Sequence, residues 1–266
     1  MTASSYDAIP DFGLLYDSVP LYAARQDIGF YVQEAASVRG SVLELGCGTG
    51  RILLPLARAG CTVVGLDNSR QMLARCRAKL AAEPAPVRAR VTLHEHDVRD
   101  FDLGATYPLV IAPFRVFQQL PAVDDQLQFL AAVARHLARG AEGRFIFDVF
   151  NPTFAKLVGA DRQEREDTPE QRLPDGRSFR RTARVARVRW VDQVSETELI
   201  YYVSTGPGTT PERFVQAFEM RWYLHAELLH LLARAGLRVR AVYGDFGRSP
   251  LTDDSPEQVV CAGLAV

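Results

Sequence analysis

The chain has 266 residues, and 47% of them are hydrophobic, which is enough to build the core of one large domain or of a domain with a sizeable insertion. Its formal net charge is −1, so no overall charge attracts the chain to nucleic acid or to an anionic membrane. The first thirty residues contain no basic stretch followed by an apolar one, and no apolar run reaches membrane-spanning length, so we expect a cytoplasmic protein.

The cysteines and histidines do not suggest a metal site. The 4 cysteines form no C-x-x-C pair and lie inside strand-like or helix-like patterns, which is typical of free thiols in a reducing compartment. His94 and His96 flank Glu95, but nothing else in the pattern supplies further ligands. We therefore expect no bound metal.

Strand-like and helix-like segments alternate in the first half of the chain. Short apolar runs followed by helical spacing predict parallel strands joined by right-handed crossovers, and hence a doubly wound sheet. Asn68 or Ser69 can cap one of the helices. The expected strands are residues 41–45, 61–67, 91–97, 107–113 and 143–150, and the expected helices are residues 49–58, 70–80 and 124–137.

The pattern changes after Asn151. Residues 160–177 are polar and contain two prolines, which predicts a loop or a mobile lid. Three β-like runs with turns between them then indicate an antiparallel insertion. The runs are residues 178–191, 194–205 and 213–223, after which a helix at 224–235 and strands at 237–245 and 258–266 restore the first pattern.

The stretch VLELGCGTG, residues 42–50, places three glycines directly after the first strand. Ligands of doubly wound sheets bind at the carboxyl ends of the strands, and glycine lets a ligand approach the backbone there. The dinucleotide fingerprint G-x-G-x-x-G requires a third glycine where this chain has Arg51. Glu44 would repel a pyrophosphate but can accept hydrogen bonds from a cation.

Two further acids end the next strands. Asp67 lies about 20 residues past the first glycine, where an acid can bind both ribose hydroxyls. Asp97 ends the third strand, where a carboxylate can accept from the exocyclic amine of adenine. The pattern therefore predicts a ligand that carries adenosine and a positive charge but no diphosphate.

These segments resemble the class I S-adenosylmethionine-dependent methyltransferases of the small-molecule type. VLELGCGTG is similar to their first motif, VVGLDNSRQML to the second and HEHDV to the third, while LVIAPFRVFQQL and GRFIFDVFNP resemble the fourth- and fifth-strand segments. LLYDSVPLYAARQDIGFY resembles the N-terminal helix that covers the cofactor in that family.

The resemblance implies a fold and three regions. We expect a Rossmann-like, doubly wound, mostly parallel seven-stranded α/β sheet with an antiparallel β insertion acting as a lid. Residues 1–40 would form a helical cap over the cofactor, residues 41–152 and 222–266 the methyltransferase core, and residues 153–221 the lid and acceptor region.

S-adenosyl-L-methionine is the cofactor that the resemblance implies, with S-adenosyl-L-homocysteine as product. Arg25 is expected to pair with the cofactor carboxylate, and Val98 to pack on the adenine. The complete expected cofactor site is Tyr16, Tyr22, Arg25, Glu44, Gly46, Cys47, Gly48, Gly50, Asp67, Asn68, Met72, Asp97, Val98, Pro113 and Phe114.

The acceptor side gives fewer signals. Residues after the fourth and fifth strands, together with insertion aromatics, are expected to line it. His225 and Arg115 are the candidates for a catalytic role, although methyl transfer needs a base only when the nucleophile arrives protonated. The expected acceptor-site residues are Phe117, Gln118, Asp148, Asn151, Trp190, Tyr201 and Trp222.

The sequence predicts a methyltransferase that acts on an N or O nucleophile of a small molecule. It leaves open the acceptor, the choice among N-, O- and C-methylation, and whether the chain is a monomer or a homodimer. A non-catalytic protein that binds the cofactor is one alternative, and a macromolecule-directed methyltransferase is another. The fourth-strand segment reads APFR rather than the N/D-P-P-Y/F run that holds a flipped base, so we expect no nucleic-acid partner.

Overall fold

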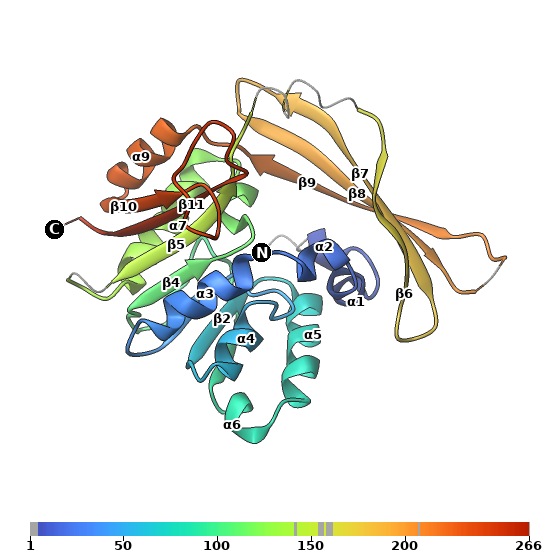
Figure 1. The fold of residues 1–266 in the computed structure, drawn as a ribbon, viewed down its shortest axis with the longest axis horizontal. Helices are drawn as coiled ribbons and strands as arrows, with labels where there is room; N and C mark the ends of the chain where they lie inside the picture. Colours follow the sequence, from blue (N-terminus) through green and yellow to red (C-terminus); the bar gives the residue numbers. More distant parts are fainter. Residues whose placement is uncertain (1–4, 141–142, 154–156, 158–161, 207, 266) are drawn as a thin grey trace.

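The structure is a computed structural model that describes residues 5–140, 143–153, 157, 162–206 and 208–265 (Figure 1). Its centre is a seven-stranded sheet in the order β10-β11-β5-β4-β1-β2-β3. The first five strands of the chain pair in parallel, while β11 and β10 run antiparallel to them. The strands are β1 (Val42–Leu45), β2 (Val63–Asp67), β3 (Val91–Glu95), β4 (Leu109–Ala112), β5 (Arg144–Phe150), β10 (Leu237–Tyr243) and β11 (Glu257–Leu264).

Helices cover both faces of this sheet. On one face, apolar side chains of α3 (Asp27–Ala36), α4 (Leu53–Arg58) and α5 (Arg70–Ala81) form one core with the strands. On the other face, α7 (Val123–His136) and α9 (His225–Arg234) form a second core. The expected doubly wound, mostly parallel sheet is therefore confirmed.

Local signals explain where these helices begin. Ser69 caps α5, because its side-chain oxygen accepts a hydrogen bond of 3.2 Å from the Met72 amide, so the capping residue is Ser69 and not Asn68. The short segments η1 (Ser5–Asp7), α6 (Ala85–Arg88) and η2 (Val116–Gln119) complete the core domain. Across the described residues, every helix is too short or too polar to span a membrane.

A second, antiparallel sheet follows β5 and stands beside the N-terminal helices (Figure 1). Its strands run in the order β6-β7-β8-β9, which confirms the expected insertion. They are β6 (Arg165–Arg172), β7 (Ser178–Arg189), β8 (Val194–Ser204) and β9 (Glu212–Arg221).

One expectation for the insertion was wrong. Residues 160–177 were expected to form a loop, but β6 lies within them and pairs with β7. It is an edge strand that exposes most of its side chains, so it shows no apolar alternation in the sequence. Pro169 is tolerated because it lies where the register shifts between Thr168 and Gln171. Residues 160 and 161 lie outside the described residues.

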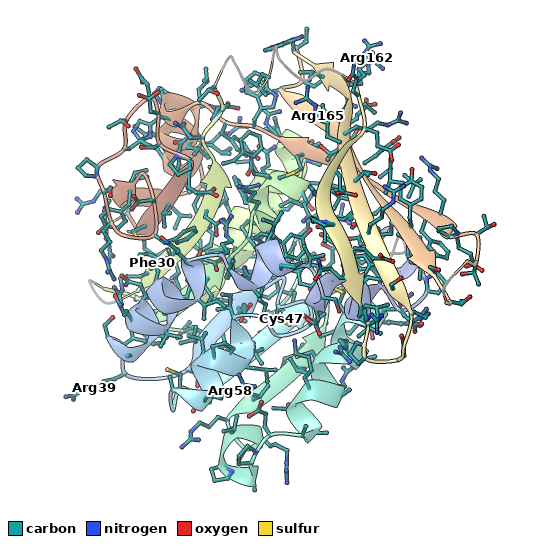
Figure 2. The ribbon with its side chains drawn as sticks, turned by 45° about the vertical axis from the view of Figure 1, so that its right-hand side comes forward. Phe30, Arg39, Cys47, Arg58, Arg162 and Arg165 are labelled. Atoms are coloured by element: carbon teal, nitrogen blue, oxygen red, sulfur yellow. The ribbon has the colours of Figure 1, made fainter. Side chains whose placement is uncertain are left out.

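The N-terminal segment fills the space between the two sheets. Phe12 and Leu15 of α1 (Phe12–Asp17) pack with Phe179 and Tyr201 of the second sheet in a third apolar core, and α2 (Pro20–Ala23) follows at once. Figure 2 shows Cys47 of the glycine loop near the centre of the molecule, beside these helices, while Arg39 extends from the outer edge. The N-terminal segment thus joins the second sheet to the ligand edge of the first.

Candidate functional site

The site lies at the carboxyl edge of the central sheet, between β1 and β4. The chain order reverses between these two strands, and the loops that follow them both face the insertion. Two cavities meet there. The first has a volume of about 420 Å³ and lies over the glycine loop, and the second has a volume of about 570 Å³ and lies under the second sheet.

The glycine loop shapes the first cavity. Gly46 has a φ of +70°, and a Cβ there would come within 2.4 Å of a Val116 methyl carbon. Gly46 therefore allows the loop after β4 to approach the loop after β1. At Gly50, where φ is +82°, a Cβ would lie 2.8 Å from the Cys76 sulfur, so this glycine packs the loop onto α5 and does not line the cavity.

Asp67 stands at the end of β2 and lines the first cavity. Its two carboxylate oxygens accept hydrogen bonds of 2.8 Å from the backbone amides of Gly48 and Ser69. Burial raises the pKa of this carboxyl despite those two bonds. The carboxylate is thus fixed against the glycine loop, and lone pairs remain for a ligand.

Asp97, after β3, lines the same cavity together with Val98. Arg99 forms a bidentate ion pair with it, at 2.9 Å and 2.6 Å, and also contacts Asp125 at 3.1 Å. These hydrogen bonds lower the pKa of Asp97. A negative charge at the end of β3 is therefore held in place by a neighbouring cation.

Glu44 is the least satisfied group of the first cavity. It is 2% exposed, and its Oε2 atom has no hydrogen-bond partner among the described residues. Burial raises the pKa of this carboxyl well above its ordinary value. A buried carboxylate that faces a cavity with a free oxygen is suited to a cationic ligand.

Arg51 brings a positive charge into the same cavity. Its two terminal nitrogens each lie 2.7 Å from an oxygen of Asp27 at the start of α3, and its guanidinium lies 4.7 Å from the centre of the Phe114 ring. Arg51 is a residue of the site that the sequence did not suggest. The available signal was its position, where the dinucleotide fingerprint has a third glycine.

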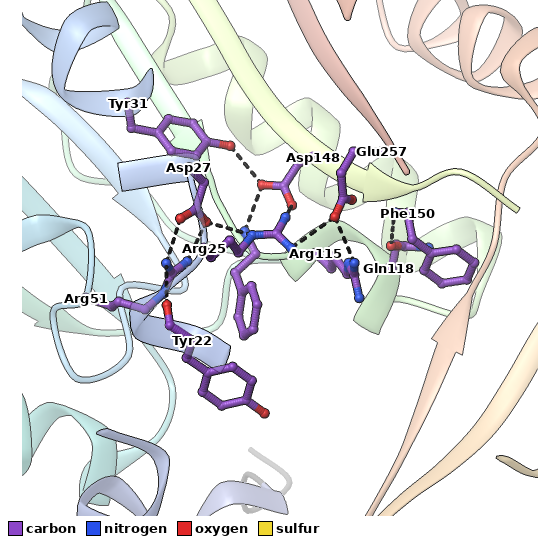
Figure 3. A network of polar contacts seen from close by, with 11 residues as sticks. Tyr22, Arg25, Asp27, Tyr31, Arg51, Arg115, Gln118, Asp148, Phe150 and Glu257 are labelled. Carbon is purple, nitrogen blue, oxygen red and sulfur yellow. Dashed lines mark hydrogen bonds and ion pairs between the residues drawn. The ribbon is translucent and has the colours of Figure 1, made fainter. Parts of the chain in front are cut away.

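A buried ionic network ties the N-terminal segment to the sheet (Figure 3). Arg25 contacts Asp27 at 2.9 Å, Asp148 at 2.7 Å and Glu257 at 3.0 Å, so one side chain joins α3, β5 and β11. Arg115 adds a contact of 2.8 Å to Glu257. The network forms one wall of the second cavity, through Arg25 and Arg115.

The loop after β4 is strained. Phe114 and Arg115 are consecutive non-glycine residues in the left-handed region, with φ of +59° and +66°. The Phe114 amide donates a hydrogen bond of 2.8 Å to Asp148, which fixes this conformation. As a result the Phe114 ring lines both cavities.

The two cavities share a wall of mainly aromatic side chains. Apolar and polar groups alternate around the second cavity, where Arg181 pairs with Asp167 and donates a hydrogen bond of 2.5 Å to the Tyr22 hydroxyl. The shared wall consists of Tyr6, Tyr16, Phe114, Gln119 and Phe218. Two ligands, one in each cavity, would therefore face each other across it.

Known proteins resemble this chain along most of its length. Residues 42–140 match the family described as a methyltransferase domain. A cypemycin N-terminal methyltransferase from a Streptomyces species is 28% identical over 83% of this chain and 81% of its own. A dTDP-3-amino-3,4,6-trideoxy-α-D-glucopyranose N,N-dimethyltransferase from Streptomyces venezuelae is 27% identical over 84% and 86%. The solved structure of the CcbJ methyltransferase from Streptomyces caelestis superposes with a TM-score of 0.76, at 26% identity, over 99% of both chains.

The glycine loop, the acids within β1, at the end of β2 and after β3, and the insertion after β5 thus occur in a chain that matches methyltransferases in family, relatives and fold. Residues 42–140 match the methyltransferase-domain family, and the whole chain has the fold of the class I S-adenosylmethionine-dependent methyltransferases.

Most residues expected to bind the cofactor of this methyltransferase lie at the first cavity. Tyr22 and Arg25 line the second cavity instead, and Gly50 lines neither. The residues that line the first cavity as expected are Tyr16, Glu44, Gly46, Cys47, Gly48, Asp67, Asn68, Met72, Asp97, Val98, Pro113 and Phe114.

The residues expected at the acceptor site line neither of the two cavities. Asp148 is 0% exposed, and its carboxylate is taken up by Tyr31, Phe114 and Arg25, so it holds the loop after β4 and lines neither cavity. Phe117 packs in the core of the central sheet, and Gln118 bridges the Phe150 amide and the Arg221 carbonyl. The turn of η2 directs the next side chain, Gln119, into the cavities instead.

The insertion aromatics are also packing residues. Trp222 lies against Trp190, with ring centres 5.8 Å apart, and Tyr201 packs on Phe12 of the N-terminal cap. Neither cavity is lined by these residues, by Asn151 or by His225. Arg115 is the catalytic candidate that does line the second cavity.

Asn151 and His225 bind other parts of the chain. Asn151 donates to the carbonyl oxygens of Thr252 and Asp253, and His225 lies on the exposed start of α9 with a nitrogen 3.3 Å from Gln258. In their place the second cavity receives residues that the sequence did not suggest. These include Phe218 of β9 and the pair Tyr6 and Gln119. The last two are hydrogen-bonded to each other at 3.2 Å.

Proposed function

We propose that this methyltransferase binds S-adenosylmethionine in the first cavity and moves its methyl group to a nucleophilic nitrogen of a small molecule in the second. The observation that carries the proposal is the shared wall of the two cavities, where Tyr16 and Phe114 line both. Methyl transfer needs two reactants aligned and water excluded, and adjoining cavities with a common aromatic wall meet that need.

The residues of the first cavity fit the cofactor. We assign Asp67 to the ribose hydroxyls, Asp97 to the adenine amine and Glu44 to the ammonium group of the methionine end. The free Oε2 atom of Glu44 supports the last assignment, because a buried carboxylate oxygen without a partner is stabilised by a cationic donor. We assign Arg51, one of the two arginines that line this cavity, to the cofactor carboxylate.

When bound, S-adenosylmethionine would supply an electrophilic methyl group on a positively charged sulfur, and the residues of the first cavity would hold it beside the acceptor. The protein's own residues then have to hold and orient both partners. Asp148 accepts a hydrogen bond from the Phe114 amide and so fixes the loop after β4. Arg25 pairs with Asp148 and so holds this carboxylate in place. These residues position the site without touching the reacting atoms.

An amine fits the second cavity better than a hydroxyl. A neutral amine attacks with its lone pair and releases a proton afterwards, whereas a hydroxyl needs a base to remove its proton. Among the residues that line this cavity, Asp167 is the carboxylate, and it is paired with Arg181 at 2.9 Å. Burial raises the pKa of Tyr6, Tyr16 and Tyr22, which keeps these phenols protonated at neutral pH. Two relatives named for methylating an amine agree with this choice.

Release of S-adenosylhomocysteine over a panel of acceptors tests the proposal. The panel contains the dTDP-3-amino sugar of the relative, a peptide with a free N-terminus and a phenol, and the reaction without acceptor is the control. We expect turnover with an amine and none with the phenol. Cofactor binding without turnover on any acceptor would favour the non-catalytic alternative, and turnover on the phenol alone would overturn the preference for an amine.

A further inference from the structure

Gln216 on β9 is buried in the wall of the second cavity without a partner. Its side chain is 3% exposed, and its Oε1 atom has no hydrogen-bond partner among the described residues. It lines the second cavity but not the first. A polar amide therefore faces the acceptor space, away from the wall that the two cavities share.

The neighbours of Gln216 on β8 and β9 that line this cavity with it are mostly apolar. Leu199 lies opposite it in the register of β8 and β9, and Leu199, Phe218 and Met220 line the same cavity. Two charged groups that line this cavity, Arg181 and Asp167, bond to each other, and no hydrogen bond joins either of them to Gln216 among the described residues. An apolar side chain at position 216 would suit this wall equally well, so packing alone does not account for a glutamine.

Other buried glutamines of the chain are satisfied by the fold. Gln118 accepts from the Phe150 amide and donates to the Arg221 carbonyl, both at 2.8 Å. Gln126 donates to the Leu120 carbonyl at 2.8 Å, and Gln258 donates to the Tyr223 carbonyl at 3.2 Å. Leaving a buried acceptor unpaired costs about 1–3 kcal/mol of stability. Gln216 keeps such an unpaired acceptor, and it lines a cavity of about 570 Å³ in which a ligand could donate a hydrogen bond to it.

We propose that Gln216 selects the methyl acceptor, by accepting a hydrogen bond from a second N–H or O–H group of that molecule, remote from the nitrogen that is methylated. The inference rests on the proposed function. It adds that the acceptor carries at least two polar groups, one at the shared wall and one at β9, with an apolar surface between them against Leu199 and Phe218. A site built to hydrogen-bond a substrate group discriminates strongly against analogues that lack it, because the protein group is then left unpaired.

The test compares Gln216→Leu and Gln216→Met with the matched control Gln118→Leu, in which a glutamine with both ends bonded is removed. Melting temperature, the Kd of S-adenosylhomocysteine, and kcat and KM for the dTDP-3-amino sugar and the N-terminal peptide are measured on each. We expect both Gln216 variants to melt at or above the wild-type temperature, because replacing an unpaired buried amide by an apolar group is neutral or stabilising. Gln118→Leu should melt lower.

The same Gln216 variants should keep the wild-type Kd for S-adenosylhomocysteine while KM for the amine rises at least about tenfold, the scale of one lost hydrogen bond of about 1.4 kcal/mol. Unchanged KM in a stable Gln216 variant overturns the inference alone, as does a loss of melting temperature equal to that of Gln118→Leu. Wild-type protein that methylates none of the probes overturns the proposed function, and this inference with it.

Discussion

At the scale of single residues, the first cavity contains three carboxylates that differ in their burial and in their partners. Asp67 is held by two backbone amides, Asp97 by Arg99, and Glu44 keeps an oxygen without a partner among the described residues. A buried carboxylate oxygen without a partner, as in Glu44, lowers the stability of the protein alone and favours a ligand that complements it. Each should therefore affect folding and cofactor binding in different proportions.

Glu44 gives the clearest contrast. Replacing it by glutamine removes a buried charge, so Glu44→Gln should be more stable than wild type without ligand at neutral pH. It should also bind S-adenosylhomocysteine more weakly, by about 1.5–3 kcal/mol, since a hydrogen bond between charged groups is lost. Thermal unfolding and calorimetry on the same preparations check both effects. Wild-type affinity in the variant would contradict the assignment of Glu44 to the ammonium group.

The pH dependence of that stability difference has a definite sign. The folded pKa of Glu44 is raised above its model-compound value of 4.5, so the folded wild type binds the proton more tightly than the unfolded chain. Its contribution to stability is therefore present below pH 4.5 and is lost as pH rises through the folded pKa. The advantage of Glu44→Gln should be largest at neutral pH and should disappear in acid. An advantage that grows in acid would contradict this reading.

Asp67 should act mainly on the cofactor. Asp67→Ala should weaken the binding of S-adenosylhomocysteine by roughly 2–3 kcal/mol, because the acceptors for both ribose hydroxyls are removed. Asp67→Asn keeps the shape and one acceptor oxygen, so it should fall between alanine and wild type. Titration calorimetry measures all three. Equal affinity of alanine variant and wild type would remove Asp67 from the ribose site.

At the scale of elements, some loops and strands line the two cavities, while others hold those lining segments in place. The loop after β4 takes a strained left-handed conformation at Phe114 and Arg115, and Asp148 of β5 holds it there. The insertion contributes β9 to the acceptor wall through Gln216, Phe218 and Met220. Three aromatic residues of this region instead pack against other aromatic rings: Trp190 and Trp222 contact each other, and Tyr201 contacts Phe12.

Trp222 tests this division. It is buried, it packs against Trp190 and it lines neither cavity, so Trp222→Ala should lower stability by roughly 3–5 kcal/mol. Turnover per folded molecule and KM for the amine should stay at wild-type values. Trp190→Ala is the matched control, because Trp190 is 46% exposed and its loss should cost less. A stable Trp222 variant with a raised KM would show that this residue does serve the acceptor, as the sequence suggested.

At the scale of the whole molecule, cofactor binding should stabilise parts of the chain that are far apart in sequence. The first cavity takes side chains from the N-terminal segment, from the loops after four strands of the central sheet and from β9. A ligand there contacts both sheets and the cap, so it opposes their separation.

Melting with and without ligand measures that effect. S-adenosylmethionine or S-adenosylhomocysteine at about 100 times its Kd should raise the free energy of unfolding by roughly 2.7 kcal/mol. For a chain of this size, that raises the melting temperature by several degrees. NAD should produce no shift, since Glu44 and the missing third glycine disfavour a pyrophosphate. An equal shift with NAD, or none with either sulfur compound, would contradict the cofactor assignment.

The sequence by itself determined the framework of this protein. Alternating apolar runs and helical spacings predicted the doubly wound sheet, and the glycines with Glu44, Asp67 and Asp97 marked its ligand edge. These features are readable because they are local: a strand end, a turn and the residue next to it lie together in the sequence and stay together in the fold. The edge strand β6 was missed because backbone pairing at an edge leaves no apolar alternation.

The tertiary structure decided which side chains face the acceptor. Phe117 and Gln118 lie two positions and one position before Gln119, yet only the turn of η2 determines that Gln119 enters the cavities while the other two are buried in the fold. Arg25 was expected to pair with the cofactor carboxylate, but in the fold it contacts the nearby Asp27 and two acids from distant strands, Asp148 and Glu257. The sequence does not distinguish Gln216 from other polar residues of its strand, and only the packing shows that its Oε1 atom is buried without a partner among the described residues. Side-chain direction and polar satisfaction depend on contacts between distant segments, and a linear pattern does not contain those contacts.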